Sequence, residues 1–357
     1  MQGSVIRDPE DEGSLNLGYL RHCLARAGRP GDASRVERFR LERLGADNSK
    51  AYRVRLEYAG EATGPQSLFL KLCDGTFGRS EVDYYRKDYT QLQDAPLPFC
   101  YDAVYEDGAY HLLLEDLSAT HRNRWDVEPT PAFGAAAAAA VARLHGHVWG
   151  AARIESAGYR ALDEAQLNRY LAYVEQGRAP MLDELRKDGN VEAVRVAERL
   201  FDMLPGAMLR RASDGDDIAL VHGDLNPGNI LTPTREDDVS ASVRLIDRQP
   251  FDWSLTNWVG PSDLAYMMVL WWPAERRRLY ELDVLRTYHA ELLRQNVEYA
   301  WDRLLDDYRL SALQCLYIPA TWCIDDRERL EMKWLWTSEL ERTIAFCRDW
   351  NVDTSGA

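Results

Sequence analysis

The first third of the chain alternates apolar and polar residues over short stretches, a pattern typical of half-buried strands. The clearest case is the stretch 52–58, in which every second residue is apolar. An Asp-Gly pair at 107–108 indicates a hairpin turn between two further apolar stretches. The pattern predicts five strands with short antiparallel connections, at 36–44, 52–58, 67–72, 98–105 and 109–114.

Apolar residues at helical spacing predict a first helix over 15–27, which we expect Ser14 to cap and Gly28 to end. A second helix is predicted between the strands, at about 80–92. After Leu117 the pattern is mostly helical, beginning with an alanine-rich run that favours helix. Long helical patterns follow at 163–173, at 191–204 and over most of 262–350. The chain is therefore expected to be an α+β protein with its strands first and its helices last.

Composition and charge narrow the classes of function. The 357 residues suit two domains, and 46% hydrophobic with 28% charged residues is ordinary globular usage. A net charge of −15 repels nucleic-acid phosphates and anionic membranes, so neither is expected as a partner. The N-terminus has no leader pattern, no apolar run is long enough for a membrane span, and six cysteines are scattered without a CxxC pair. A cytoplasmic protein without structural zinc is expected, and its oligomeric state stays open.

Three polar residues stand out where apolar strands end between 218 and 249. Asp224 and Asn229 lie five residues apart in a loop between strands, and Asp247 follows the apolar stretch 243–246. Phosphoryl transfer needs a carboxylate that accepts the proton of the attacking hydroxyl, and oxygen ligands for Mg²⁺. Asp224 would supply the base, and Asn229 and Asp247 the metal ligands. Each residue alone is also a common turn former, but the ordered set favours the chemical interpretation.

His222-Gly223-Asp224 with Asn229, followed by Leu245-Ile246-Asp247, resembles the aminoglycoside phosphotransferase and choline kinase-like family, a branch of the protein-kinase-like fold. The resemblance covers about residues 36–350. It implies two lobes with a nucleotide in the cleft between them. The small lobe, with a five-stranded antiparallel sheet, would be 1–117, and the mostly helical catalytic and acceptor-binding lobe would be 118–357.

The resemblance also implies nucleotide contacts in the small lobe. Lys71 lies on the third strand and Glu81 on the next helix, where the family has a phosphate-binding lysine and its partner. Ser49 would reach the phosphates, and Glu115 with Leu117 lies at the family's hinge beside the base. A solvated strand lysine and ordinary linker polarity are the alternative interpretations of these residues.

In the larger lobe the resemblance assigns supporting roles to three residues. His145 ends a Leu-His pair and is expected to brace the catalytic loop, together with His222 of the loop itself. Asp263 matches an aspartate that begins a helix and holds the loop. The alternative for Asp263 is an N-terminal capping acid, and the two roles are compatible.

The sequence departs from the family at two places. The loop between the first two strands has one glycine, so it is no protein-kinase glycine-rich loop. Arg248 follows Asp247, where relatives often have an aromatic residue. The sequence therefore does not decide how the side chains around the metal site pack. Gln249 resembles the Asp-x-Gln of ecdysteroid-kinase-like members.

Nine of the 11 tryptophans come after residue 250, and most are expected in the helical core. A few would wall an acceptor pocket, for which the candidates are Trp253, Trp322, Asp325 and Asp326. Acidic residues favour a cationic acceptor, but arginines are interleaved with them, as on a solvated helix face. The tryptophan excess favours a bulky hydroxylated natural product over a polycationic aminoglycoside.

The predicted function is transfer of the γ-phosphoryl group of ATP or GTP to a hydroxyl of a small molecule such as a natural product or antibiotic, with Mg²⁺. One alternative is a nucleotide-binding pseudokinase scaffold, which the complete set of Lys71, Asp224, Asn229 and Asp247 disfavours. The other is a metal-dependent phosphoesterase, a chemistry that usually needs several histidine ligands, whereas only His222 is near.

Overall fold

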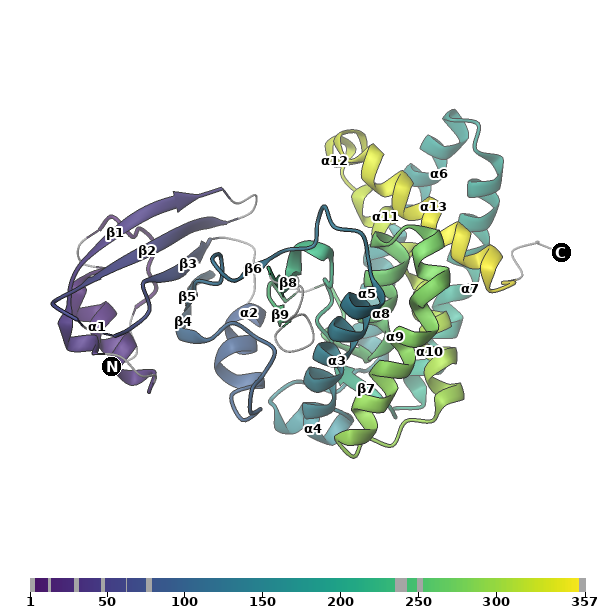
Figure 1. Cartoon of the computed structure of the whole chain (residues 1–357). Helices are drawn as coiled ribbons and strands as arrows, with labels where there is room; N and C mark the ends of the chain where they lie inside the picture. The colour runs from purple at the N-terminus through teal and green to yellow at the C-terminus, as the bar shows by residue number, and fades with distance from the viewer. Residues whose placement is uncertain are drawn as a thin grey trace. The chain divides into compact units, whose positions relative to one another are not determined.

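The computed structural model describes residues 4–11, 14–28, 32–45, 49–61, 63–74, 79–234, 243–248 and 253–352 (Figure 1). The chain forms two compact units. Unit 1 comprises 1–122 with 232–235 and 244–252, and unit 2 the remaining residues. No helix within the described residues is long and apolar enough to span a membrane.

Unit 1 contains the predicted five-stranded antiparallel sheet, in the order β1-β2-β3-β5-β4. Its inner face buries alternate residues of the strands, including Val54, Leu68 and Leu70, against α1. This alternation is the reason that the sequence pattern predicts the strands well. Their bounds are β1 Val36–Leu44, β2 Lys50–Tyr58, β3 Ser67–Cys73, β4 Cys100–Glu106 and β5 Ala109–Glu115, with the short helix η1 at Ala33–Arg35 before β1.

Helix α1 (Leu17–Arg26) begins later than predicted, and its cap is Asn16 rather than Ser14. The Asn16 side chain accepts a hydrogen bond from the backbone N–H of Tyr19 at 2.9 Å. The Ser14 hydroxyl instead donates to the backbone carbonyl of Asp8, in the turn before the helix. Serine and asparagine are both common at the N-cap position, so the sequence alone does not decide whether Ser14 or Asn16 caps the helix.

The helix predicted at 80–92 is shorter and irregular. One α-helical turn, α2 (Ser80–Asp83), continues into the π-helical turn η2 (Tyr84–Asp88). The tyrosines of η2 are buried and pack edge to face, Tyr84 against both Tyr85 and Tyr89. These large rings fill the space around η2, and a propensity pattern carries no information on such packing.

Unit 2 is built mainly of helices, and α3 and α9 lie side by side in it (Figure 1). Gly134 lies at this contact, where an added Cβ would meet Val284 at 2.7 Å, so the small residues of α3 allow a close approach. The helices are α3 Pro131–His147, α4 Ala151–Ser156, α5 Glu164–Glu175, α6 Arg178–Lys187, α7 Val191–Ser213, α8 Pro261–Ala265, η5 Tyr266–Trp271, α9 Ala274–Arg294, α10 Trp301–Gln314, α11 Tyr317–Trp322, α12 Asp326–Glu331 and α13 Lys333–Asp349.

Short strands hold the segment that carries the polar residues of interest. In unit 2, β7 (Ile218–Leu220) pairs antiparallel with β10 (Asn257–Val259), a strand that the sequence pattern does not predict. A three-stranded sheet has the order β6-β8-β9, with β6 at His121–Arg122, β8 at Ile230–Pro233 and β9 at Arg244–Leu245. The short helix η3 (Pro227–Asn229) precedes β8.

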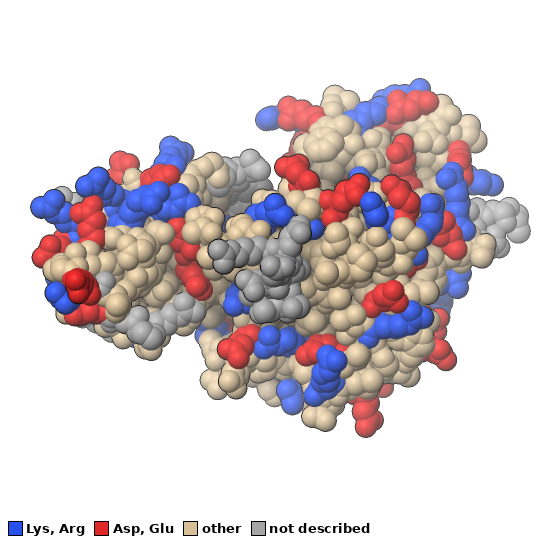
Figure 2. Space-filling view, viewed as in Figure 1, with Lys and Arg blue, Asp and Glu red and all other residues tan. Residues whose placement is uncertain are grey.

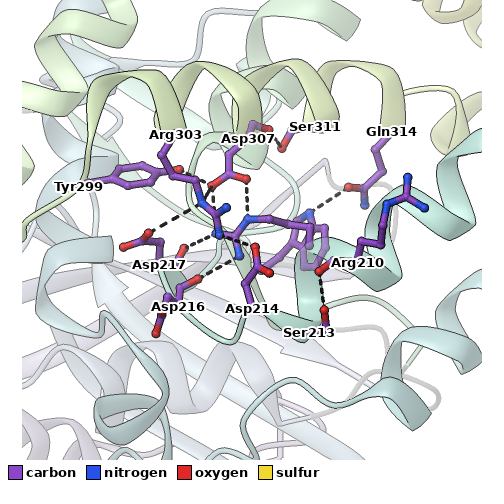
Figure 3. Close-up of polar contacts among 12 residues, drawn as sticks. Arg210, Ser213, Asp214, Asp216, Asp217, Tyr299, Arg303, Asp307, Ser311 and Gln314 are labelled. Carbon is purple, nitrogen blue, oxygen red and sulfur yellow. Dashed lines mark hydrogen bonds and ion pairs between the residues drawn. The ribbon is translucent and has the colours of Figure 1, made fainter.

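A polar network anchors the entry to β7 (Figure 3). The buried Arg211 guanidinium near the end of α7 pairs with both carboxylate oxygens of Asp307 on α10, at 2.6 and 3.0 Å. Arg211 also donates to the backbone carbonyl of Asp216, and the Tyr299 hydroxyl donates to Asp307 at 2.7 Å. These bonds fix the turn from α7 into β7, which leads directly to the loop of Asp224.

Acidic and basic side chains are interspersed over unit 2 on the face shown in Figure 2. Many of them form exposed ion pairs between neighbouring helices, such as Arg186 with Glu198 and Arg348 with Glu192. Such pairs contribute little to stability, and they neutralise the acidic charge locally. The mixed charge therefore agrees with solvated helix faces.

Candidate active site

Asp224 lies half-buried in the loop that follows β7, and three side chains donate hydrogen bonds to its carboxylate. Asn226 Nδ2 donates to Oδ1 at 3.0 Å, Tyr266 Oη to Oδ1 at 2.8 Å, and Asn229 Nδ2 to Oδ2 at 3.1 Å. Burial, with the Asp224 charge next, raises the pKa of Tyr266 well above its usual value, so its phenol stays a donor. The carboxylate is thereby held in one orientation, as a general base must be.

Asp263 holds the backbone of the same loop. Its carboxylate accepts the backbone N–H groups of His222 at 2.7 Å and Gly223 at 2.8 Å, and the His145 ring lies 3.0 Å from it. Burial alone would raise the pKa of Asp263, but the hydrogen bond and charge of His145 outweigh it and lower the pKa. The other ring nitrogen of His145 lies 2.8 Å from Tyr288 Oη. These bonds connect His145 and Asp263 to the backbone of His222 and Gly223, and the bracing of a catalytic loop by these residues stays a prediction.

In unit 1, Lys71 on β3 forms a buried ion pair with Glu81 of α2, at 2.9 and 3.0 Å. Its ammonium also contacts Asp247, so the pair that the sequence predicts has a third member. Burial disfavours the charge on Lys71, but Glu81 and Asp247 outweigh burial and raise the pKa of the lysine. Tyr110 on β5 donates a hydrogen bond to Glu81 at 2.5 Å. Lys71 is therefore a fixed cation.

Asp247 has a backbone φ of 59°, in the left-handed region that few residues other than glycine adopt. Such strain persists at sites where the surroundings impose it, and it often marks functional residues. The Asp247 side chain is 42% exposed although Leu245, two residues earlier, is fully buried. The conformation thus turns a carboxylate outward at the end of a buried strand.

Arg248 forms an ion pair with Asp88 of η2 in which both side chains are almost completely buried. The sequence leaves the packing around Arg248 undecided, and the structure shows a buried salt bridge there. Gln249 lies outside the described residues, as do residues 46–48 of the loop before Ser49.

The remaining predicted nucleotide contacts lie at strand ends of unit 1. Ser49 directly precedes β2, and Glu115 is the last residue of β5. The Glu115 carboxylate accepts the backbone N–H of Phe99 at 3.3 Å, and the carbonyl of Leu117 accepts two backbone N–H groups of the following turn. These positions leave their roles toward a nucleotide as predictions.

The four predicted acceptor residues differ in their surroundings. Trp253 stacks on Tyr173 with ring centroids 4.4 Å apart. Asp325 is the N-cap of α12, and Asp326 is exposed and pairs with Arg329 at 2.7 Å. Trp322 has its indole nitrogen buried at the end of α11. Asp325 thus caps a helix and Asp326 forms a surface ion pair, whereas Trp322 is partly exposed with its indole nitrogen buried.

The two predicted metal ligands, Asn229 and Asp247, each offer side-chain oxygen atoms, the donors that Mg²⁺ prefers. Among the described residues no group of three or more His, Cys, Asp or Glu side chains is placed to hold a metal ion. The Asn229 side-chain nitrogen donates two hydrogen bonds to Asp224, one to its backbone carbonyl at 2.9 Å and one to its carboxylate. Neither bond uses the side-chain oxygen of Asn229, which is the atom that a metal ion would take. An amide oxygen and the carboxylate of Asp247 are hard donors, and Mg²⁺ takes one or two of these while phosphates and water complete its shell.

Sequence reasoning missed several residues that support these groups. Tyr266, Asn226 and Tyr110 hold Asp224 and Glu81, and Glu339 of α13 influences the ionisation of Tyr266. Asn226 lies within the loop, so its Asn-x-Gly turn was the available signal. The others come from distant elements, and no local pattern points to them.

The fold and the loop of Asp224 together define a kinase-like phosphotransferase. The model of the phosphotransferase enzyme family matches residues 41–243, more than half of the chain, and the chain belongs to this family. The predicted resemblance and the predicted enzyme class are thereby confirmed. No significant match to a curated protein sequence is found.

Several solved structures are similar to the chain at low sequence identity, and the first of those given below has a TM-score of 0.50. An ethanolamine kinase from Plasmodium vivax is 14% identical with a TM-score of 0.50, covering 95% of this chain and 89% of its own. The aminoglycoside phosphotransferase APH(3'')-Id from Streptomyces rimosus, solved with ADP and streptomycin, is 19% identical with a TM-score of 0.45, covering 79% and 92%. A macrolide 2'-phosphotransferase from Brachybacterium faecium is 15% identical with a TM-score of 0.45, covering 92% and 97%. The predicted kinase-like fold is confirmed.

Proposed function

We propose that the protein transfers the γ-phosphoryl group of ATP or GTP to a hydroxyl of a small-molecule acceptor. The observation that carries the proposal is the arrangement around Asp224, whose carboxylate accepts hydrogen bonds from three side chains. The backbone of the same loop is held by the carboxylate of Asp263. A carboxylate held in this way orients an attacking hydroxyl and accepts its proton.

The residues of unit 1 support a nucleotide co-substrate. Lys71, fixed by Glu81, offers a cation to the α- and β-phosphates, and Asp247 offers a metal ligand at a strained strand end. Asn229 of unit 2 would be the other protein ligand of Mg²⁺. When bound, Mg²⁺ neutralises charge on the β- and γ-phosphates during transfer. That Ser49, Glu115 and Leu117 contact the nucleotide, and that the protein works in the cytoplasm, stay part of the proposal.

The test is a screen of alcohol-bearing metabolites and antibiotics with ATP or GTP and Mg²⁺, read as a mass gain of one phosphoryl group. The family of the chain contains enzymes with very different acceptors on one fold, so a broad panel is needed. Transfer to at least one alcohol is expected. Tight Mg²⁺-nucleotide binding without transfer to any alcohol would instead favour the pseudokinase scaffold.

A further inference from the structure

Trp125 is a large aromatic residue that lies exposed beside the loop of Asp224. It is 51% exposed and belongs to the segment between β6 and α3. A Cβ atom added to Gly228, in the short helix η3 of that loop, would lie 3.6 Å from the Trp125 ring. The indole therefore lies against η3, with much of its surface still open to solvent.

Two hydrogen bonds lead from Gly228 to the proposed base. The backbone N–H of Gly228 donates to Asn226 Oδ1 at 2.8 Å, and Asn226 Nδ2 donates to Asp224 Oδ1 at 3.0 Å. Asp224, Asn226 and Gly228 are all partly exposed. The base and the indole thus lie close together, and a ligand can reach both.

A second tryptophan, Trp271, supports Trp125 from the helix that also holds the base. The two indoles pack with ring centroids 5.0 Å apart and planes tilted by 46°. Trp271 is the last residue of the π-helical turn η5, and Tyr266, which donates to Asp224 at 2.8 Å, is the first. Residues five apart in a π-helix are joined across one turn by its backbone bonds. The contacts through η3 and through η5 therefore place the two tryptophans beside Asp224 independently.

The segment that carries Trp125 is fixed to the same loop. The backbone N–H of Arg124 donates to the carbonyl of Pro227 at 2.9 Å. The buried Arg124 guanidinium lies over the ring of Phe133 on α3, with its central carbon 4.7 Å from the ring centroid. An aromatic ring that is held in place before a ligand arrives loses little conformational entropy on binding.

The chemistry of the two indoles favours a flat, uncharged ring as their ligand. Indole faces stack on other flat rings, and stacking removes apolar area from water. Indoles also attract cations, but this attraction is weak at an exposed ring, where water competes for the cation. Of the acids that follow Trp125, Glu128 pairs with Arg276 at 2.6 Å and Asp126 is exposed to solvent. Neither is a buried charge that would favour a cation over a neutral ring.

We propose that the acceptor stacks a flat ring on Trp125, which Trp271 supports, while Asp224 orients the acceptor hydroxyl. The acceptor class is then an uncharged alcohol with an aromatic or other flat ring a few bonds from the reacting hydroxyl. The inference rests on the proposed function only for the role of Asp224, because the stacking site is defined by the two tryptophans.

The test uses three alcohols with the same three-carbon arm, which ends in a phenyl ring, a cyclohexyl ring or a trimethylammonium group. Their binding to the full chain with ADP and Mg²⁺ is measured by saturation-transfer NMR, which needs no turnover. We expect the wild type to bind the phenyl alcohol about fivefold more tightly than the other two probes, the effect of one aromatic pair beyond its buried area.

Trp125→Leu should remove the preference for the phenyl alcohol, whereas Trp125→Tyr keeps a ring and should keep most of it. The thermal midpoint of each variant checks that it folds. Trp334→Leu makes the same change at an exposed tryptophan of α13, and this matched control should keep the full preference. With an acceptor from the transfer screen, Trp125→Leu should raise the acceptor KM about fivefold and leave the nucleotide KM unchanged.

Three results would overturn the inference: tighter binding of the trimethylammonium alcohol by the wild type, equal or undetectable binding of the three probes, or a phenyl preference that survives in a folded Trp125→Leu. None of these results affects the proposed function, which the transfer screen tests separately. A phenyl preference that depends on Trp125, without transfer to any alcohol, would support the stacking site and contradict the proposed function.

Discussion

The guanidinium of Arg248 forms a buried ion pair with the carboxylate of Asp88. Asp88 ends η2, which continues the helical turn that carries Glu81, and Arg248 directly follows Asp247. Glu81 and Asp247 are the two acidic partners of Lys71. The Arg248 to Asp88 pair therefore joins the two segments that hold Lys71.

Arg248→Met should destabilise unit 1 strongly, because it leaves Asp88 as a buried carboxylate without its ionic partner. Breaking a buried pair from one side costs about 3–5 kcal/mol of unfolding free energy. Adding Asp88→Leu should recover most of this loss. Urea denaturation measures both variants, and Arg40→Met, which breaks the exposed pair with Glu57, is the control with a loss below about 1 kcal/mol. A loss in Arg248→Met no larger than in the control would contradict the role of the pair.

Tyr266→Phe should lower kcat about tenfold while the KM for nucleotide stays unchanged, because it removes one of three donors that orient Asp224. The phenol position stays filled by a ring of the same shape, so the thermal midpoint should change little. Steady-state kinetics at saturating nucleotide measure the effect. Tyr280→Phe, whose hydroxyl accepts from Arg276 on α9, is the control and should keep full activity. Equal kinetics in the two variants would remove Tyr266 from the site.

Lys71→Ala should raise the KM for nucleotide and lower kcat, each by about tenfold or more, because it removes a fixed cation for the phosphates. Glu81→Gln should have a smaller effect in the same direction, since Lys71 loses its anchor. Lys50→Ala on β2, an exposed lysine, is the control. Loss of thermal stability in Lys71→Ala without any kinetic change would make the lysine a structural residue only.

The stability of the protein should depend on the ionisation of Glu339. The pKa of this acid is about 8 in the folded chain against an ordinary value of 4.5. Between these values the folded chain binds more protons than the unfolded chain, so the unfolding free energy falls as pH rises from about 4.5 to 8. Burial is the largest cause of this raised pKa; Arg342 and the hydrogen bond of Trp322 oppose it, and the charge of Asp224 adds to it. Glu339→Gln lacks this loss, so the variant should gain stability over the wild type as pH rises through this window. A difference that is constant with pH would contradict the raised pKa.

The acceptor KM should change little with salt. The acidic groups on the surface of unit 2 are mixed with arginines (Figure 2), and the tryptophans predicted to wall an acceptor pocket carry no charge. Screening by salt weakens the binding of a polycation but scarcely affects hydrogen bonds to neutral groups or apolar contacts. The measurement is acceptor KM at low and high ionic strength, and a steep rise would favour a polycationic acceptor.

Local patterns predicted the strands of unit 1 and the loop from His222 to Asn229, since alternation and turn residues are properties of adjacent positions. They did not predict the π-helical turn η2, which depends on how Tyr84 and its neighbours pack. They also missed Tyr266 and Glu339, because each reaches the region of Asp224 from a distant helix. The surroundings of Arg248 could not be predicted for the same reason, since its partner Asp88 is far away in the sequence.

The central claim is that Asp224 is the base of a phosphoryl transfer to an alcohol. The most direct measurement compares wild type and Asp224→Asn for phosphoryl transfer to the best alcohol of the screen, followed by mass, and for Mg²⁺-nucleotide affinity, followed by calorimetry. The account predicts a turnover lower by about a hundredfold or more with nearly unchanged nucleotide affinity. An Asp224→Asn enzyme that transfers at the wild-type rate would contradict it.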